Sequence, residues 1–399
     1  MNSTTDTESG LSQPRVSVLI LTKNEEKNIA SCIRSCSWSD DIVVLDSCSE
    51  DSTREIAKRF SNVRVIVRPF DTEYLHRNFG LHEIDYRHPW VYICDADERL
   101  PVGLIDEMAC RILDDDGVAA YQLRYKNMFM GRWLRHATSY PVWIMRLVRP
   151  RRVSYEERAT NVHPVVDGKL GRLSEHFIHY SFNLGLRRWF EKHNFYSDAE
   201  AEELTRVRTT SFLAETRSML RGELSRRRWM KNTSFRLPFR GRLRWLVDYL
   251  LRRGWSDGVA GYTYCRLICL YEDWIWLKAK QLSLPDPDGQ PDPVAVVIAR
   301  RIEAGFTAAA DSGNVGKPRP SGFGYLARAI LVPKWVLLRE LIIQGRVFRG
   351  PRGVLEAYFL SGLTLIDAVA DYERISDWSI DDGVPPGELL YKPPADTAD

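Results

Sequence analysis

The feature that most constrains the fold of this chain is a series of short apolar segments near its N-terminus. They lie at residues 16–21, 41–45, 63–67 and 90–94. Runs of roughly four to eight apolar residues are typical of strands buried on both faces of a parallel sheet. Residues 24–36 and 51–60 lie between these runs and are expected to be helical. The alternation predicts an α/β fold, with a mostly parallel sheet and helices on both faces.

Polar side chains gather where three of these predicted strands end. They are Thr22, Asn24 and Glu25 after the first strand, Asp46 and Ser49 after the second, and Asp95 and Asp97 after the last, with Ala96 between these two aspartates. Ligands of parallel α/β sheets bind beyond the carboxyl ends of the strands. We therefore expect these residues to form one binding site, although Asn24 and Glu25 are also typical of a simple helix entry.

The paired carboxylates of Asp95 and Asp97 are the strongest chemical signal in the sequence. Two carboxylates on one turn can hold Mg²⁺ or Mn²⁺ through oxygen ligands, and such a cation neutralises a nucleotide diphosphate. The structural alternative is an acidic turn before the helix that follows Pro101. The position after a buried strand favours the metal site.

The second half of the chain is predicted to be helical and basic. Residues 206–253 contain fourteen Lys or Arg residues against three acids, a balance that favours an anionic partner. Amphipathic helices with tryptophan predict a peripheral membrane anchor, and a soluble helical domain is the alternative. The candidate lipid-facing residues are Arg226, Arg227, Arg228, Arg240, Arg242 and Arg244, with Trp245, Tyr249, Trp255 and Tyr262 at the headgroup boundary.

The cysteines and the N-terminus bear on the compartment. Seven cysteines without a short metal-binding spacing indicate neither a disulfide framework nor a structural zinc site, which favours a reducing cytoplasm. The N-terminal residues lack the pattern of a secretory signal, and no apolar stretch reaches the roughly 18 residues of a membrane span. We therefore expect a cytoplasmic protein, peripheral on the inner face of the cytoplasmic membrane.

Three segments together resemble a known family. VSVLILTKNEEKNIASCIRS, VVLDSCSEDST and YICDADE are similar to the nucleotide-sugar-binding half of family 2 inverting glycosyltransferases, which have the GT-A fold. Within that family the chain is similar to the WaaE-like lipopolysaccharide core glucosyltransferases. The motifs that carry this second likeness are His76-Arg77-Asn78, His179-Tyr180-Ser181, Lys192-His193-Asn194 and Gly254-Trp255-Ser256-Asp257-Gly258.

The resemblance implies roles for individual residues. Asp46 would contact the nucleobase, Asp97 would be the principal metal ligand, and Asp95 would contact ribose or the metal. Arg77 and Asn78 would belong to the donor site, and His179, Lys192 and His193 to the acceptor site. By the same likeness the donor is a nucleotide diphosphate sugar, with UDP-glucose favoured, and the acceptor is a glycan or a lipid-linked molecule.

The general base of an inverting transfer is open. Where WaaE-like proteins commonly have Val-His-Glu, this chain has Val162-His163-Pro164, so the expected acid is missing. The candidates nearby are Glu156, Glu157, Asp167 and His163 itself, whose imidazole is largely neutral at physiological pH. Among them we favour Glu157.

These patterns divide the chain into six expected segments. They are a flexible tail (1–14), the GT-A domain (15–203), a basic helical segment (204–282), a linker rich in Pro, Asp and Gly (283–321) that contains a short helix at 294–304, a second helical segment resembling the first (322–380) and a flexible tail (381–399). Glycines 254, 258 and 261 are expected to break the first helical segment, and Gly345, Gly350 and Gly353 the second.

The expected function is transfer of a hexose with anomeric inversion in cell-envelope polysaccharide or lipopolysaccharide synthesis. Two alternatives remain, a metal-dependent nucleotidyltransferase and a catalytically idle membrane-associated assembly protein. The first would normally show a Gly-rich phosphate loop after the first strand, where this chain has Thr22-Lys23-Asn24-Glu25. A homodimer through the aromatic-rich C-terminal segments is possible on sequence grounds, and no nucleic-acid partner is expected.

Overall fold

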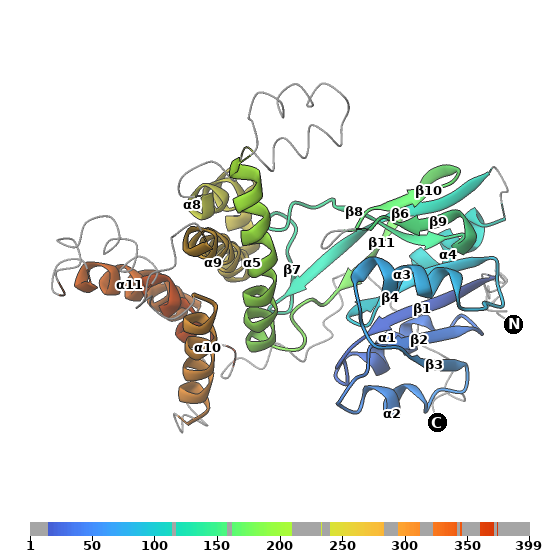
Figure 1. Cartoon of the computed structure of the whole chain (residues 1–399), viewed down its shortest axis with the longest axis horizontal. Coiled ribbons are helices and arrows are strands. Elements are labelled where there is room, and N and C mark those ends of the chain that lie inside the picture. Colours follow the sequence, from blue (N-terminus) through green and yellow to red (C-terminus); the bar gives the residue numbers. More distant parts are fainter. Residues whose placement is uncertain are drawn as a thin grey trace, which may run out of the picture. The chain divides into compact units, whose positions relative to one another are not determined.

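The computed structural model describes residues 15–113, 117–157, 162–209, 240–282, 294–311, 322–340 and 360–370, with residues 233, 344 and 373. The described residues form two compact units (Figure 1). The first contains residues 15–128 and 140–183, and the second contains residues 129–139 and those from 184 onward. The expected tails at 1–14 and 381–399 lie outside the described residues, as do Arg226, Arg227, Arg228, Gly345, Gly350 and Gly353.

The first unit is built on one large sheet. Its order is β3-β2-β1-β4-β8-β6-β11-β5, and the pairs from β3 to β4 are parallel. The strands are β1 (Val16–Thr22), β2 (Ile42–Asp46), β3 (Val63–Val67), β4 (Trp90–Asp95), β5 (Glu98–Arg99), β6 (Val118–Phe129), β8 (Trp143–Val148) and β11 (Lys169–His179). A small separate sheet pairs β9 (Val153–Tyr155) with β10 (Pro164–Val166).

Helices cover both faces of this sheet. Val18 and Ile20 of β1 pack with α1 (Ile29–Cys36), α2 (Thr53–Ala57) and α4 (Val102–Arg111) on one face, and Leu19 packs with α3 (Glu73–His82) on the other. This is the alternation expected of a strand buried on both sides. The predicted α/β class is therefore confirmed.

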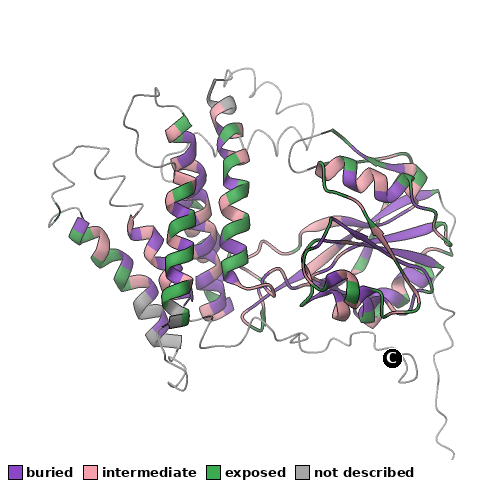
Figure 2. Cartoon of the chain, turned by 60° about the horizontal axis from the view of Figure 1, so that its bottom comes forward, coloured by how far each residue is buried: buried purple, intermediate pink, exposed green. Residues whose placement is uncertain are grey.

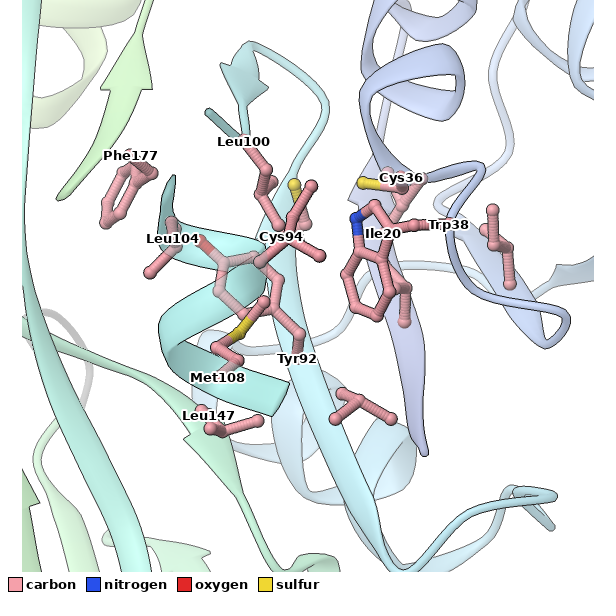
Figure 3. Close-up of a cluster of buried hydrophobic side chains, with 14 of the residues drawn as sticks. Ile20, Cys36, Trp38, Tyr92, Cys94, Leu100, Leu104, Met108, Leu147 and Phe177 are labelled. Atoms are coloured by element: carbon pink, nitrogen blue, oxygen red, sulfur yellow. The ribbon is translucent and has the colours of Figure 1, made fainter. Parts of the chain in front are cut away.

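The core on the α1 and α4 side combines aromatic, aliphatic and thiol groups. Figure 3 shows Trp38, Tyr92, Met108 and Phe177 around β4, with Cys36 and Cys94 nearby. Cys94 and Cys32 are fully buried and their sulfurs lie 3.6 Å apart. The three cysteines pack there as small apolar side chains. Sequence spacing gave no sign that Cys32, Cys36 and Cys94 would meet.

One expectation about local structure in the first unit needs correction. The helix expected over 24–36 begins only at Ile29, because Asn24 has a positive φ of 57° that a helix cannot include. The longest strands described are β6 and β11. Both strands join the main sheet and extend it beyond the parallel part.

The second unit is helical. It contains α5 (Leu186–Thr209), α8 (Arg240–Trp245), the π-helical segment η3 (Leu246–Leu251), α9 (Gly258–Leu282), α10 (Val294–Asp311) and α11 (Gly322–Leu338). Exposed residues lie along one side of α5 and α10, whereas α9 is buried or half-buried along nearly its whole length (Figure 2). The short helix expected at 294–304 is α10, which continues to Asp311. No described helix is long and apolar enough to cross a membrane.

The glycine-rich break before α9 has a packing reason. Asp257 accepts hydrogen bonds from the backbone N–H groups of His136 and Ala137 at 2.9 and 2.8 Å, which ties residues 129–139 to the helices. The expected break at Gly261 is wrong, because this residue lies inside α9. A Cβ at Gly261 would lie 2.1 Å from the Gly254 carbonyl oxygen, so the glycine allows a close backbone approach.

Several arginines of the basic segment are paired within the second unit. Arg240 binds Glu272 at 3.0 Å, and Arg244 and Arg252 bind the buried Asp248 at 2.6 and 2.7 Å. Tyr262 is 8% exposed, which corrects its expected position at a headgroup boundary, whereas Trp255 is 51% exposed. Contacts between the helices therefore occupy some of the basic and aromatic side chains that the sequence analysis assigned to a membrane surface.

In the first unit, a buried carboxylate joins the ends of several strands and loops. Asp41 accepts hydrogen bonds from the Ser17 hydroxyl at 2.6 Å, the Arg64 guanidinium at 2.9 Å and the Arg87 backbone N–H at 2.9 Å. Burial acts to raise the pKa of Asp41, but these three donors outweigh it and hold the pKa below its ordinary value. The folded state therefore favours the ionised carboxylate.

We predict that Asp41→Asn lowers the free energy of unfolding at pH 7 by about 2 kcal/mol, because the replacement loses charge-assisted hydrogen bonds in a buried site. Since the folded pKa is depressed, this contribution is present above the unfolded pKa of about 3.9 and is lost as the pH falls through the folded pKa. Urea unfolding of both proteins at neutral and acidic pH measures the difference.

The matched control is Asp40→Asn, at the neighbouring position, whose side chain is 62% exposed. Exposed ion pairs contribute at most about 1 kcal/mol, so this variant should stay close to wild type. Equal losses in the two variants, or an Asp41→Asn loss that grows at acidic pH, would contradict the account.

Candidate functional site

The polar residues that follow the strands meet at one edge of the sheet. In the parallel register Thr22 of β1 lies opposite Asp46 of β2, and Leu21 lies opposite Asp95 of β4. These residues are at the carboxyl ends of adjacent parallel strands. The structure therefore brings the three predicted clusters together.

Side-chain hydrogen bonds join the loops that follow β1 and β2. The Asn24 N–H donates to Ser49 Oγ at 2.8 Å, and the Glu50 N–H donates to Asn24 Oδ1 at 2.8 Å. The Glu25 N–H donates to Thr53 Oγ1 at 2.8 Å. Asn24 is suited to this turn because its short polar side chain tolerates the left-handed backbone region. The side chains of Asn24 and Ser49 thus shape the loops of the site.

Asp46 is fully buried beneath these loops. Its carboxylate accepts the Ser49 N–H at 2.8 Å and the Ser49 hydroxyl at 2.5 Å, and Arg54 lies 3.9 Å away. Across the strand pair, Thr22 Oγ1 is buried and has no hydrogen-bond partner among the described residues. A buried hydroxyl without a partner is uncommon, and here it marks unused hydrogen-bonding capacity beside Asp46.

The Asp95-Ala96-Asp97 turn is fixed by an ion pair with Arg146 of β8. The Arg146 guanidinium contacts Asp95 Oδ2 at 2.5 Å and also binds the Glu98 carboxylate. Burial acts to raise the pKa of Asp95, but Arg146 and Arg77 outweigh it and lower that pKa. Burial raises the pKa of Glu98 to about 8, with Arg146 acting against the rise. One arginine therefore stabilises an ionised Asp95 beside a Glu98 that is largely protonated at neutral pH.

Asp97 contacts a residue that is distant from it in the sequence. The His179 Nε2 atom of β11 lies 3.2 Å from Asp97 Oδ2, and the Tyr180 N–H donates to the Asp97 carbonyl at 2.8 Å. Burial acts to lower the pKa of His179, but the Asp97 carboxylate outweighs it and raises that pKa. The side chains of His179 and Asp97 are 26% and 21% exposed, so both are accessible from solvent.

The Asp97 and His179 pair is compatible with a divalent cation. Adjacent ligands of an octahedral cation with bonds of about 2.1 Å are roughly 3 Å apart, which is close to the 3.2 Å between Asp97 Oδ2 and His179 Nε2. Carboxylate oxygen suits Mg²⁺ and Mn²⁺, and imidazole nitrogen is a common ligand of transition metals. The carboxylate oxygen and the imidazole nitrogen at this turn are therefore suitable ligands for the expected Mg²⁺ or Mn²⁺.

The two predicted donor residues of α3 occupy different surroundings. Arg77 lies over the Tyr155 ring, with its Cζ 5.5 Å from the ring centroid, and the opposite charge of Asp95 acts to raise the pKa of Arg77 against its burial. The Asn78 side chain donates to the Tyr155 carbonyl at 3.0 Å and accepts the Tyr155 N–H at 2.7 Å. Asn78 thus fixes β9 to α3, while Arg77 adds positive charge near Asp95.

The candidate bases lie on the segment that Asn78 holds. The Glu156 N–H donates to the His163 carbonyl at 3.1 Å. The pKa of Tyr74 on α3 is raised mainly by burial, and the negative charge of the Glu157 carboxylate raises it further. Asp167 is 88% exposed and lies 3.7 Å from Arg152. The charge of Glu157 thus acts on α3, the helix that carries Arg77.

The remaining acceptor candidates belong to the second unit. His193 stacks on Trp189 with ring centroids 3.7 Å apart, and its Nδ1 lies 2.8 Å from the Trp189 carbonyl oxygen. Burial lowers the pKa of His193 to about 4, so the ring is neutral at physiological pH. Lys192 lies over the Tyr196 ring at 5.7 Å. Only His179 of the three acceptor candidates lies in the same unit as the strand-end residues.

Sequence reasoning missed Arg146 and Arg99. Arg99 is 1% exposed and donates to the carbonyls of Ala96 and Glu98 at 3.1 and 2.8 Å, so it helps to fix the turn. One signal was available for Arg146, which is the single charge within the otherwise apolar strand Trp143–Val148. A lone charge in a buried strand usually has a buried partner of opposite sign.

Comparisons with known proteins agree with this geometry. The model of the family described as "Glycosyl transferase family 2" matches residues 17–193. An uncharacterised glycosyltransferase of Rickettsia typhi is 29% identical over 48% of this chain and 68% of its own length. The lipopolysaccharide core biosynthesis glycosyltransferase LpsC of Rhizobium meliloti is 23% identical over 47% of this chain and 71% of its own length.

Solved structures show a more limited likeness. The glucosyl-3-phosphoglycerate synthase of Mycobacterium tuberculosis, solved with Mn²⁺, uridine diphosphate and phosphoglyceric acid, is 26% identical over 28% of this chain and 43% of its own, with a TM-score of 0.24. TarS of S. aureus is 12% identical over 87% of this chain and 90% of its own, with a TM-score of 0.31. Scores this low add no argument, so the assignment rests on the sheet topology and the family match. On that basis residues 17–193, less than half of the chain, are similar to the family 2 glycosyltransferases.

Proposed function

We propose that the first unit transfers a hexose, with anomeric inversion, from a nucleotide diphosphate sugar to a glycan or lipid-linked acceptor of the cell envelope. UDP-glucose is the favoured donor. The observation that carries the proposal is the meeting of Thr22, Asp46 and Asp95 at one sheet edge, with Asp97 and His179 beside them. The products would belong to polysaccharide or lipopolysaccharide synthesis, the process named for the Rhizobium relative.

The donor is proposed to lie across the strand ends with its base near Asp46 and its diphosphate near Asp97. Thr22 Oγ1, which is buried without a partner in the described part of the chain, supports a polar ligand group beside Asp46. Arg77 supplies positive charge on the diphosphate side, where Asp95 alone would repel an anion. The loops that carry Asn24 and Ser49 are fixed to each other by hydrogen bonds.

We assign Asp97 and His179 as the ligands of Mg²⁺ or Mn²⁺, which moves His179 from the acceptor to the metal. Asp95 is already bound to Arg146, which favours a supporting role for its carboxylate. When bound, the cation would neutralise charge that develops on the departing nucleotide diphosphate. Arg146 and Arg99 would keep the turn in place by their buried contacts.

An inverting displacement also needs a base beside the acceptor hydroxyl. We propose Glu157, because it lies on the segment that Asn78 anchors to α3 and its carboxylate acts on Tyr74. Its role is to accept the proton of the attacking hydroxyl while that oxygen bonds to the anomeric carbon and the nucleotide diphosphate leaves. Glu156, His163 and Asp167 are the comparison residues.

The first test addresses the cation. Asp97→Asn should reduce sugar transfer by about 10²-fold or more, since it removes a charged ligand, and His179→Gln should raise the Mn²⁺ concentration needed for half-maximal activity about tenfold. Transfer and donor hydrolysis would be measured over a panel of nucleotide sugars, with and without cell-envelope lipid extract.

Asp106→Asn, an exposed acid on α4, serves as the control and should match wild type. Full activity in EDTA, or in a folded Asp97→Asn protein, would remove the metal role. In a parallel assay, attack of a sugar 1-phosphate on a nucleoside triphosphate, with release of inorganic diphosphate, would indicate a nucleotidyltransferase. No turnover of any donor would favour an idle assembly protein.

The second test addresses the base. Glu157→Gln should lower the rate at saturating donor by about 10²- to 10⁴-fold, the usual loss when a positioned general base is removed. Glu156→Gln, His163→Ala and Asp167→Asn are compared in the same assay, and Glu55→Gln on α2 is the exposed control. If all four candidate variants keep activity within a few-fold of wild type, the base lies elsewhere.

We further propose that the second unit docks on an anionic membrane surface. Leu243, Leu246 and Leu250 are exposed and recur at helical spacing next to arginines of the same segment. This combination is typical of helices that lie in a membrane interface. Arg240, Arg244 and Arg252 form ion pairs within the unit. The exposed leucines therefore support membrane docking more strongly than these arginines do.

The full chain should therefore float with anionic vesicles and not with neutral vesicles, and the association should weaken as salt rises. The double variant Leu243→Asp/Leu250→Asp should remain at the bottom of the gradient, because each aspartate introduces a charge into the apolar stripe. Leu113→Asp, at a 77% exposed leucine of the first unit, should float as wild type does. Flotation that is unchanged in the double variant would rule out this stripe as the docking surface.

A further inference from the structure

The helical unit contains a cavity that the proposed sugar transfer does not use. Its volume is about 440 Å³, and it lies between α8, η3, α9, α11 and the helical residues 360–370. This is within the range of roughly 300–1,000 Å³ typical of small-molecule sites. All of its lining residues belong to the second unit.

Most of the cavity wall is apolar. It includes the indole of Trp245 and the aliphatic side chains of Leu270, Ile330, Leu337 and Leu365. These side chains come from helices that are distant in the sequence, so the cavity depends on the packing of the whole helical unit. A wall of this kind favours a hydrocarbon chain, because the chain removes apolar surface from water when it enters.

The charged residues of the wall are mainly basic. Arg242, Arg266 and Lys334 line the cavity together with one acid, Asp273. Among the described residues, the Arg266 guanidinium and the Lys334 ammonium form no hydrogen bond or ion pair. The excess of positive charge favours an anionic group on the ligand.

Two donors of the wall are also unused. Arg266 Nε and Trp245 Nε1 are buried and have no acceptor within the part of the chain that the structure describes. Buried N–H groups usually have a partner, and leaving one unsatisfied is unfavourable. Two such donors beside an apolar cavity indicate a ligand with acceptor oxygens.

We propose that this cavity binds an anionic amphiphile that consists of an aliphatic chain ending in a phosphate. The chain occupies the space between Leu270, Ile330 and Leu365, and the phosphate lies near Arg266 and Lys334. A neutral amphiphile would leave these cations unpaired, and inorganic phosphate would leave the apolar wall empty. Phospholipids and lipid-linked glycan carriers share this chemistry.

The proposal is tested by calorimetric titration of the full chain with three probes below their micelle-forming concentrations. Dodecyl phosphate should bind at one saturable site. Dodecyl maltoside, which has the same chain and a neutral head, should bind at least about tenfold more weakly, and inorganic phosphate should show no saturable binding. Dodecylphosphocholine, whose phosphate carries a second substituent, distinguishes a phosphodiester phospholipid from a terminal phosphate.

Variants place the site. Lys334→Gln and Arg266→Gln should each weaken dodecyl phosphate binding about fivefold, as expected for one cation near an anionic group. Gly362→Leu should weaken binding of both dodecyl probes by filling the cavity. A Cβ at Gly362 first meets Leu270 Cδ1 at 3.3 Å, the end of a flexible side chain that can move by a few tenths of an ångström.

Lys280→Gln, at an exposed position of α9 away from the cavity, is the charge-matched control and should bind as wild type does. Equal affinity for the phosphate and maltoside probes, or unchanged binding in Gly362→Leu and Lys334→Gln, would overturn the proposal. Lys334 is exposed on α11, so we expect the Lys334→Gln variant to fold and its weaker binding to report on the site. Donor hydrolysis is measured separately, which keeps this outcome independent of sugar transfer.

Discussion

The buried Arg146 guanidinium is the interaction on which the rest of the candidate site depends. It is 3% exposed and binds Asp95 and Glu98, the residues that flank the Ala96-Asp97 pair. Without this cation, the half-buried Asp95 carboxylate would lie beside the buried Glu98 carboxyl group without the Arg146 charge that stabilises its ionised form. The position of the Asp97 carboxylate, and therefore of any cation bound to it, follows from a charge supplied by the neighbouring strand β8.

The rest of the site extends this arrangement along the sheet edge. The parallel register places Thr22, Asp46 and Asp95 together, and hydrogen bonds fix the loops after β1 and β2 to each other. On the other side β11 delivers His179 to Asp97, and α3 holds both Arg77 and the β9 segment. Each contribution comes from a different element. The site is therefore a property of the whole first unit and could not be read from the paired aspartates alone.

The sequence was informative where structure is local. Apolar runs predicted β1 to β4 within a residue or two, and the strand-end clusters followed from the general behaviour of parallel sheets. It failed where distant segments meet. The contact of His179 with Asp97 depends on the β11 register, which no local pattern encodes. Arg146, the meeting of Cys32, Cys36 and Cys94, and the helical interior position of Gly261 were missed for the same reason, since each depends on tertiary packing.

The central claim is that a divalent cation and a nucleotide diphosphate bind together at the carboxyl ends of β1, β2 and β4. The most direct measurement is an anomalous difference map from crystals grown with Mn²⁺ and UDP, recorded near the manganese absorption edge. The account predicts one strong peak within about 2.3 Å of Asp97 and His179, with the nucleotide base beside Asp46. A nucleotide bound at the strand ends without such a peak, or a manganese peak away from Asp97, would contradict it.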